Sequence, residues 1–225
     1  MCIPGAAPAE KRLSAMDRIT YDTLVAMFRS AATVIRDNSQ LLSQLDSVGG
    51  DGDHGTTMAR AMAAVEKALE QCSSRTMKAL LENIGWAVMG IDGGATGPLL
   101  GTFFAGMADA LGEDGSLSGA DLAKVLEAGL ARLRTMTRAD VGDKTMMDAI
   151  IPAVAAARRA ADDGRNAGEV LAAAAAAAQA GAESTKNIPA RYGRAKNIRE
   201  KSIGSPDAGA TSVSLILKGF SQSAG

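Results

Sequence analysis

The stretch "TYDTLVAMFRSAATVIR", residues 20–36, decides the fold class of this chain. Its apolar residues recur at spacings of three and four, at Leu24, Met27, Phe28, Ala31 and Val34. That spacing places side chains along one face of an α-helix. The segment is therefore expected to be an amphipathic helix with one face in a core.

The same spacing recurs along the rest of the chain, and strand patterns are nearly absent. Further helices are expected over 39–48, 56–72, 75–89, 98–111, 118–136, 145–161, 167–185 and 208–220. Ser118 is placed to cap one of them, ahead of Asp121 in its first turn. The run "LAAAAAAAQA" is assigned to a helix because alanine is the best helix former, and the β-branched run "TSVSLIL" is also interpreted as a buried helix. Counting 20–36, eight of these segments are longer helices and 39–48 is a short one. We predict an all-α domain of about eight helices over 16–225, behind a flexible N-terminal arm over 1–15.

Composition excludes several classes of function. The net charge is −1 and the cations are scattered, so there is no electrostatic case for nucleic acid. Cys2 and Cys72 form no CxxC pattern, which favours a reducing compartment over a disulfide framework. No apolar run has membrane-spanning length, and the first residues lack the order of a secretory signal. A cytoplasmic protein without a membrane partner is expected.

Three aspartates, Asp46, Asp51 and Asp53, fall within eight residues and are interleaved with glycines. Two carboxylates about 4 Å apart repel by roughly 4 kcal/mol at the effective dielectric of a protein surface, so a cation is expected among them. Hard oxygen ligands suit Mg²⁺ or Ca²⁺. A solvated Asp/Gly turn is the alternative. His54, the one histidine of the sequence, suits a general base, a phosphate carrier or a hydrogen bond that fixes the loop.

Three further loops carry polar or glycine-rich sequence. "DGGATGPLLGTFF", 92–104, precedes a helix whose N–H groups would attract phosphate, although a structural glycine turn explains it equally well. In "VGDKTMMDAI", 141–150, Asp143 is placed to cap a helix, Lys144 to reach a phosphate, and Met146 to pack on a flat base. "RYGRAKNIREKSIGSPDAGATS", 191–212, holds five cations, which suit either a solvated face or a polyphosphate.

Taken in order, these loops resemble the L subunit of dihydroxyacetone kinase, the nucleotide-binding half of that enzyme. The matching stretches are "LDSVGGDGDHGTTMARA", "GGATGPLLGTFF", "GDKTMMDAIIPA" and "GRAKNIREKSIGSPDAGATS". The resemblance covers nearly the whole chain after about residue 15. It implies an eight-helix antiparallel barrel with the nucleotide site formed by loops at one end.

The resemblance also implies a role for individual residues. Asp46, Asp51 and Asp53 would hold two Mg²⁺ ions, and those ions would hold the phosphates of ADP or ATP. The residues implied to contact the nucleotide are His54, Gly55, Thr56, Thr57, Ala95, Thr96, Thr137, Met146, Arg194, Asp207, Ala208 and Gly209. Ala208 stands where the family commonly has proline, which loses rigidity but no ligand.

The implied activity is transfer of a phosphoryl group to dihydroxyacetone or a related ketose. The family's substrate half binds its ketone covalently through a histidine, and the one histidine here is already placed beside the aspartates, so a separate K subunit is expected to hold the acceptor. Lys196, Asn197 and Ile198 replace a common Ser-Tyr-Leu, which leaves the ketose open, erythrulose included. The donor is open between ATP and a phosphotransferase-system protein, and a homodimer is also open. The alternative functions are a nucleotide domain of a fatty-acid-kinase-like system and a non-catalytic ADP-binding regulator.

Overall fold

Nine α-helices form nearly all the regular structure in the part of the chain that is described, residues 16–112 and 115–223 of a computed structural model. They are α2 (Tyr21–Asp37), α3 (Ser39–Ser47), α4 (His54–Gln71), α5 (Met77–Met89), α6 (Thr96–Met107), α7 (Gly119–Leu133), α8 (Met147–Asp162), α9 (Ala167–Ser184) and α10 (Ala208–Gln222). The prediction of an all-α fold is confirmed. The expected arm over 1–15 lies outside the described residues.

Short polar side chains set where several helices begin. Ser118 forms the expected capping box with Asp121 at the start of α7, and Asn166 forms a second one with Glu169 at the start of α9. Most helix ends lie within three residues of their expected positions, which is the usual uncertainty of such boundaries. On α2 the buried residue of the last turn is Ile35, whereas Val34 is only half-buried.

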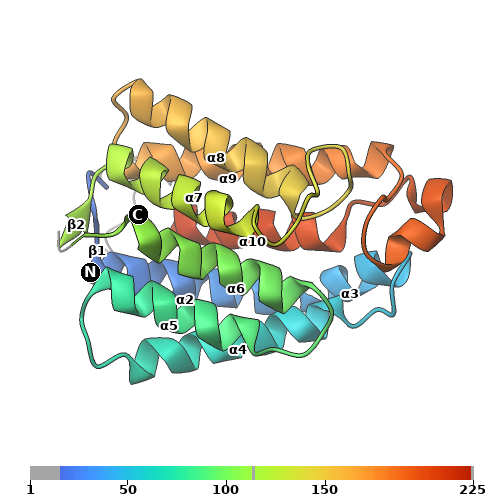
Figure 1. Ribbon diagram of the computed structural model, residues 1–225, viewed down its shortest axis with the longest axis horizontal. Coiled ribbons are helices and arrows are strands. Elements are labelled where there is room, and N and C mark those ends of the chain that lie inside the picture. The colour runs from blue at the N-terminus through green and yellow to red at the C-terminus, as the bar shows by residue number, and fades with distance from the viewer. Residues whose placement is uncertain (1–15, 113–114, 224–225) are drawn as a thin grey trace, which may run out of the picture.

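Eight of the helices close into a ring, and Figure 1 shows them from the side, running along the long axis of the molecule. Each helix from α4 to α9 packs against the next one along the chain, α2 packs against α4, and α10 packs against α2. The short helix α3 stands outside this ring and packs mainly against α4. The expected eight-helix barrel is therefore the architecture of the described chain.

Small residues let the helices approach closely. A side chain at Gly85 on α5 would collide with Ala105 on α6, and one at Gly101 would collide with the backbone of α5. Three phenylalanines fill the space where α2, α6 and α10 meet, with the Phe28 ring 5.2 Å from that of Phe104 and 4.9 Å from that of Phe220. These edge-to-face contacts are the favoured arrangement for aromatic rings.

One short piece of sheet was not expected from the sequence. The strands β1 (Ile19–Thr20) and β2 (Ser116–Leu117) pair antiparallel, with Ile19 opposite Leu117. Two-residue strands carry no alternating pattern, so sequence periodicity gives no signal for them. This two-stranded sheet lies at one end of the barrel (Figure 1).

The alternation of helix direction brings four connections together at the other end. These are the connections α3–α4, α5–α6, α7–α8 and α9–α10, the last of which includes the 3₁₀ helices η2 (Thr185–Asn187), η3 (Arg194–Asn197) and η4 (Arg199–Ser202). They hold the four loops singled out in the sequence. None of the described helices is both long and apolar enough to cross a membrane.

Candidate functional site

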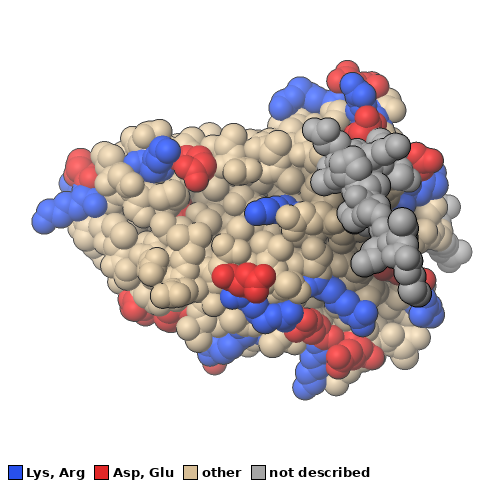
Figure 2. Space-filling model, turned by 180° about the vertical axis from the view of Figure 1, so that it is seen from behind, with Lys and Arg blue, Asp and Glu red and all other residues tan. Residues whose placement is uncertain are grey.

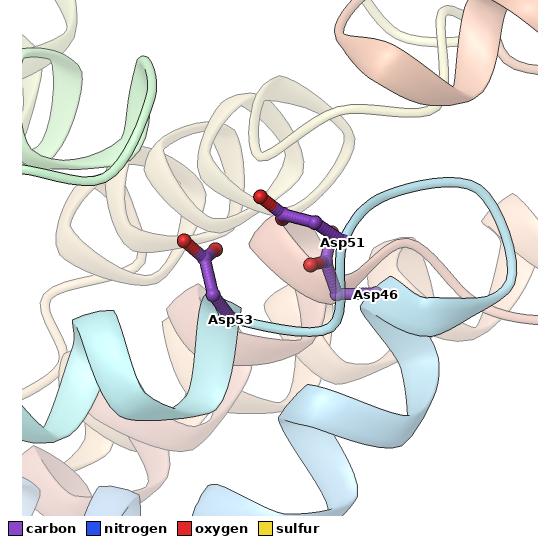
Figure 3. Close-up of side chains that lie close together, drawn as sticks. All are labelled: Asp46, Asp51 and Asp53. Atoms are coloured by element: carbon purple, nitrogen blue, oxygen red, sulfur yellow. The ribbon is translucent and has the colours of Figure 1, made fainter.

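The three aspartates come together between α3 and α4. Asp46 lies in the last turn of α3, Asp51 on the connecting loop, and Asp53 immediately before α4. One carboxylate oxygen from each lies within 4.8 Å of the others, and Figure 3 shows the three side chains gathered around one space. The sequence therefore predicted a cluster that the described chain contains.

The turn that builds this cluster requires glycine at two positions. Gly52 has a φ of +76°, which favours glycine, and its N–H donates to Asp46 Oδ2 at 2.9 Å. A Cβ at Gly50 would collide with the carboxylate of Asp46. The loop thus wraps around Asp46 and places Asp51 and Asp53 beside it.

A cation already reaches the cluster from the far end of the chain. Arg194, on the connection between α9 and α10, forms an ion pair with Asp51. Both side chains remain about half exposed, so the pair is weak and open to exchange. Three converging carboxylates are the hard oxygen donors that Mg²⁺ prefers, so the residues present fit a divalent cation.

The aspartates stand at the edge of a cleft of about 410 Å³, within the size range of small-ligand sites. All four loops contribute to its lining. The predicted site residues that line it are Asp46, Asp51, Asp53, His54, Ala95, Thr96, Thr137, Met146, Arg194, Asp207, Ala208 and Gly209. One end of the cleft is thus acidic, and other parts present the apolar side chains of Leu99, Met136 and Met146.

Two helices begin at this cleft without a side-chain cap. Asp53 precedes α4 and Ala95 precedes α6, and neither side chain accepts a hydrogen bond from its helix. The first N–H groups of a helix have no partner within the helix and carry the positive end of its dipole. Both helix starts therefore suit an anion such as phosphate.

Three predicted residues do not line the cleft. Gly55 is buried, and a Cβ there would collide with the backbone of Ser39, so it permits close packing of α4 on α3. Thr57 is buried against Gly93, and Thr56 is exposed in the first turn of α4. Gly55 and Thr57 therefore help to set the position of α4. The contribution of Gly55 and Thr56 to a ligand would come from backbone N–H groups, while the Thr57 N–H donates to the Asp53 carbonyl at 2.9 Å.

His54 is buried between three helices. Its Nε2 lies 2.7 Å from Ser212 Oγ on α10, and its Nδ1 lies 3.5 Å from Thr96 Oγ1 on α6. Burial lowers the pKa of the imidazole, although the nearby Asp46 carboxylate partly opposes this shift. The sequence left three roles open for His54: a general base, a phosphate carrier or a hydrogen bond that fixes the loop. These contacts fit the hydrogen bond.

Asp207 caps α10 at the back of the cleft. Its Oδ2 accepts from the Ala210 N–H at 2.7 Å, and its own N–H donates to Thr185 Oγ1 at 2.8 Å. Burial raises the pKa of this carboxyl to about 6, although the Ala210 hydrogen bond acts in the opposite direction. Asp207 thus fixes the start of α10.

Two expectations for the loop 141–150 are wrong. Asp143 does not cap α8; it accepts from the Asp140 N–H and pairs with Arg191, while Asp148 accepts from the Thr145 N–H instead. Lys144 does not project toward a phosphate, because its ammonium group is buried against four backbone carbonyls. Local sequence gave no signal for these distant acceptors.

Sequence reasoning also missed two residues that line the cleft and a serine that contacts His54. Ser212 holds His54 from α10, and Met136 and Tyr192 line the cleft as exposed apolar side chains. The available signal was that Met136 and Tyr192 are large apolar loop residues, one and two positions before the predicted site residues Thr137 and Arg194. Nothing in the sequence near Ser212 indicated its role, because its partner His54 lies 158 residues away and meets it only when α10 packs into the ring.

The charged side chains elsewhere are mixed in sign. On the face shown in Figure 2, acidic and basic groups lie near one another, and a broad area carries few charges. The described residues visible on that face form no basic stripe of the kind that binds a nucleic-acid backbone.

The fold and the site together define a closed all-α barrel with an acidic ligand cleft at one end. The DAK2 domain family matches residues 48–222. The chain is 34% identical over 180 residues to the PEP-dependent dihydroxyacetone kinase, ADP-binding subunit DhaL, of Escherichia coli (strain K12), covering 80% of this chain and 86% of that subunit. The chain belongs to the DAK2 domain family and is of the DhaL type within it.

Two larger proteins contain a similar region. The chain is 35% identical over 206 residues to the L-erythrulose 1-kinase of Mycolicibacterium smegmatis, covering 88% of this chain and 35% of that enzyme. It also matches a crystal structure of the dihydroxyacetone kinase from C. freundii in complex with AMP-PNP and Mg²⁺, with a TM-score of 0.69 and 26% identity, covering 99% of this chain. The chain spans only 37% of the length of that kinase.

Proposed function

We propose that this chain is the Mg-nucleotide-binding subunit of a kinase for dihydroxyacetone or a related ketose. One observation carries the proposal: three converging carboxylates stand at a cleft that also receives two uncapped helix starts. Carboxylates hold metal ions and helix starts hold phosphates, so the two together suit a metal-bound polyphosphate. The names of the relatives, an ADP-binding subunit and a ketose kinase, support the same activity.

In this proposal Asp46, Asp51 and Asp53 hold two Mg²⁺ ions. When bound, the ions would neutralise the charge of the phosphates during phosphoryl transfer. Arg194 lies close enough to Asp51 to add a further positive charge at the same place. The nucleotide is ADP or ATP.

The other predicted residues surround the remaining parts of the nucleotide. The N–H groups of His54, Gly55 and Thr56 and those at Ala95 and Thr96 face the phosphates, whereas the Thr57 N–H donates within α4 to the Asp53 carbonyl at 2.9 Å. Thr137 and Met146 border the base and sugar. Asp207, Ala208 and Gly209 close the back of the cleft, where the cap on α10 keeps the backbone in place.

The acceptor is proposed to bind on another chain. The sequence contains one histidine, and that ring is engaged with Ser212 and Thr96. A K subunit therefore supplies the ketone site. The phosphoryl donor is ATP itself or a phosphotransferase-system protein that rephosphorylates bound ADP. The domain assignment to 16–225, a homodimer and a cytoplasmic location stay predictions of the sequence.

The ketose is either dihydroxyacetone or a larger relative such as erythrulose. Lys196, Asn197 and Ile198 lie on the segment that carries Arg194, next to the acidic end of the cleft. A change of side chains there alters the surface that a substrate-bearing partner would approach. The similarity to an erythrulose kinase supports testing both sugars.

Reconstitution tests this function. The purified chain is incubated with Mg²⁺, ATP and either ketose, alone and then with a K subunit from the same source and a phosphotransferase-type donor. Transfer is expected only with the K subunit. A turnover of roughly 1 s⁻¹ or more by the chain alone would contradict the need for a partner. Mg-ADP binding without transfer under any condition would favour a non-catalytic regulator, and transfer to a fatty acid would favour the fatty-acid-kinase-like alternative.

A further inference from the structure

A buried lysine in the wall of the cleft has no place in the nucleotide assignment. Lys144, on the connection between α7 and α8, is 5% exposed. Its Nζ donates to the carbonyl oxygens of Thr185 at 2.7 Å, Ser202 at 2.8 Å and Ser205 at 2.6 Å, and a fourth carbonyl, that of Ile188, lies at 3.3 Å. An ammonium group has three N–H donors, so all of them are used.

These carbonyls belong to the two ends of one segment. Thr185 and Ile188 lie where α9 ends, and Ser202 and Ser205 lie just before α10 begins. The segment between them, 186–204, carries Arg194 to the aspartates. One ammonium group therefore joins both ends of the segment that delivers this guanidinium.

The turn around Lys144 is built to aim its side chain inward. Lys144 has a φ of +60°, a left-handed conformation that is uncommon for a residue with a side chain. The Asp148 carboxylate holds this turn by accepting from the N–H groups of Gly142 at 2.7 Å and Thr145 at 2.8 Å. Strained backbone persists where the surroundings over-determine it, which is common at functional sites.

The hydrogen bonds to the carbonyls offset the cost of burying the Lys144 ammonium group. A buried ammonium group is costly unless it is hydrogen-bonded, and here burial lowers the pKa of Lys144 while Asp207 and Asp148 oppose that shift. The carbonyls satisfy the charge only when both ends of the segment are in place. Other bonds also join these ends, among them Gly204 N–H to Lys186 O at 2.7 Å and Ala190 N–H to Ser202 Oγ at 2.9 Å. Loss of the lysine should therefore loosen the segment and leave the fold intact.

We propose that Lys144 is a positioning residue: it closes the base of segment 186–204 and so places Arg194 against the aspartate cluster. The effect on nucleotide affinity rests on the proposed function. The effect on the segment itself does not, so the two are tested separately.

Limited trypsin digestion tests the segment. Arg191, Arg194, Lys196, Arg199 and Lys201 are cleavage sites within it, and their cleavage rates are followed by mass spectrometry. Lys144→Met is expected to raise these rates at least about fivefold, because cleavage reports the open population of a segment. The matched control is Leu80→Ala, a fully buried residue on α5 that does not line the cleft; it should lower stability without accelerating these cuts. Unchanged rates in Lys144→Met, or an equal rise in Leu80→Ala, would overturn the proposal.

A double-mutant cycle tests the link to Arg194. Calorimetry measures Mg-ADP affinity for wild type, Lys144→Met, Arg194→Ala and the double variant. Arg194→Ala is expected to weaken binding about tenfold in wild type but less than about threefold when Lys144 is absent, since coupled residues are not additive. Asp53→Asn should keep its full effect in both backgrounds, which separates positioning from general damage.

The double-mutant cycle decides whether Lys144 positions Arg194. Equal effects of Arg194→Ala in both backgrounds would overturn the positioning role of Lys144. If Lys144→Met does not fold, Lys144→Gln replaces it, because an amide keeps two N–H donors for the carbonyls. If wild type binds no Mg-ADP, the proposed function fails, while the trypsin result still decides whether Lys144 closes the segment.

Discussion

Replacing Asp51 with asparagine should change stability and metal-dependent binding in opposite directions. The carboxylate oxygens of the cluster lie within 4.8 Å of one another. At that separation each pair repels by about 0.9 kcal/mol if the surroundings screen like water, and by about 3.5 kcal/mol at an effective dielectric of 20. Asp51 and Arg194 are both about half exposed, so the lower value is the appropriate one.

Asp51→Asn removes two of these repulsions and one surface ion pair. The ion pair with Arg194 contributes about 0–1 kcal/mol, and the relieved repulsion about 1.7 kcal/mol. Without metal, the free energy of unfolding should therefore rise by about 1 kcal/mol, which corresponds to roughly 2–4 °C in melting temperature for a chain of this size. With metal, the loss of a ligand should weaken Mg-ADP binding by at least tenfold, about 1.4 kcal/mol.

The assay combines thermal melting in EDTA with calorimetry of ADP in Mg²⁺. Asp22→Asn is the matched control, because Asp22 is also an exposed, ion-paired aspartate. It lies in the first turn of α2, directly after β1 and away from the cleft, so its replacement should leave Mg-ADP affinity unchanged. A clear loss of stability of Asp51→Asn in EDTA would refute the repulsion argument. An unchanged Mg-ADP affinity would refute the assignment of Asp51 as a metal ligand.

Three further outcomes are expected. ADP with Mg²⁺ at a hundredfold excess over Kd should stabilise the fold by about 2.7 kcal/mol, and ADP with EDTA should do much less; equal melting shifts would contradict the link between aspartates and metal. His54→Ala should slow the reconstituted kinase at least about tenfold, because Ser212 and Thr96 lose their common partner; mass spectrometry should find no phosphohistidine at His54, and finding one would show a carrier role. The pKa of Asp207 is raised to about 6 in the folded chain, so its protonation favours folding below about pH 4 and this contribution is lost as the pH rises toward 6. The melting temperature of wild type relative to Asp207→Asn should therefore fall between pH 4 and 7, and a constant difference would exclude the raised pKa.

Much of the fold could be predicted because its signals are local. The apolar spacing of each helix and the cap at Ser118 depend on residues three or four positions apart. The all-α class followed from these patterns alone. The closed barrel was implied by the family resemblance, since no local pattern states that α10 packs against α2.

The candidate site divides in the same way. The convergence of Asp46, Asp51 and Asp53 could be predicted from the sequence, because they are close in the chain and the glycines between them permit the turn. The contact of Arg194 with Asp51 spans most of the chain and exists only because the ring closes. Asp143 and Lys144 were misjudged for the same reason, because their partners lie in or beside the distant segment 186–204.

The sequence by itself determined the helices, their capped ends and the acidic turn, because short-range periodicity, side-chain caps and glycine conformation act within a few residues. Only the tertiary structure decided which loops share one end of the barrel, which cation meets the aspartates and what the buried lysine holds. These depend on the packing of small residues between helices and on hydrogen bonds between segments far apart in the chain. Such contacts form only when the whole ring is assembled. They make the aspartate loop one wall of a cleft.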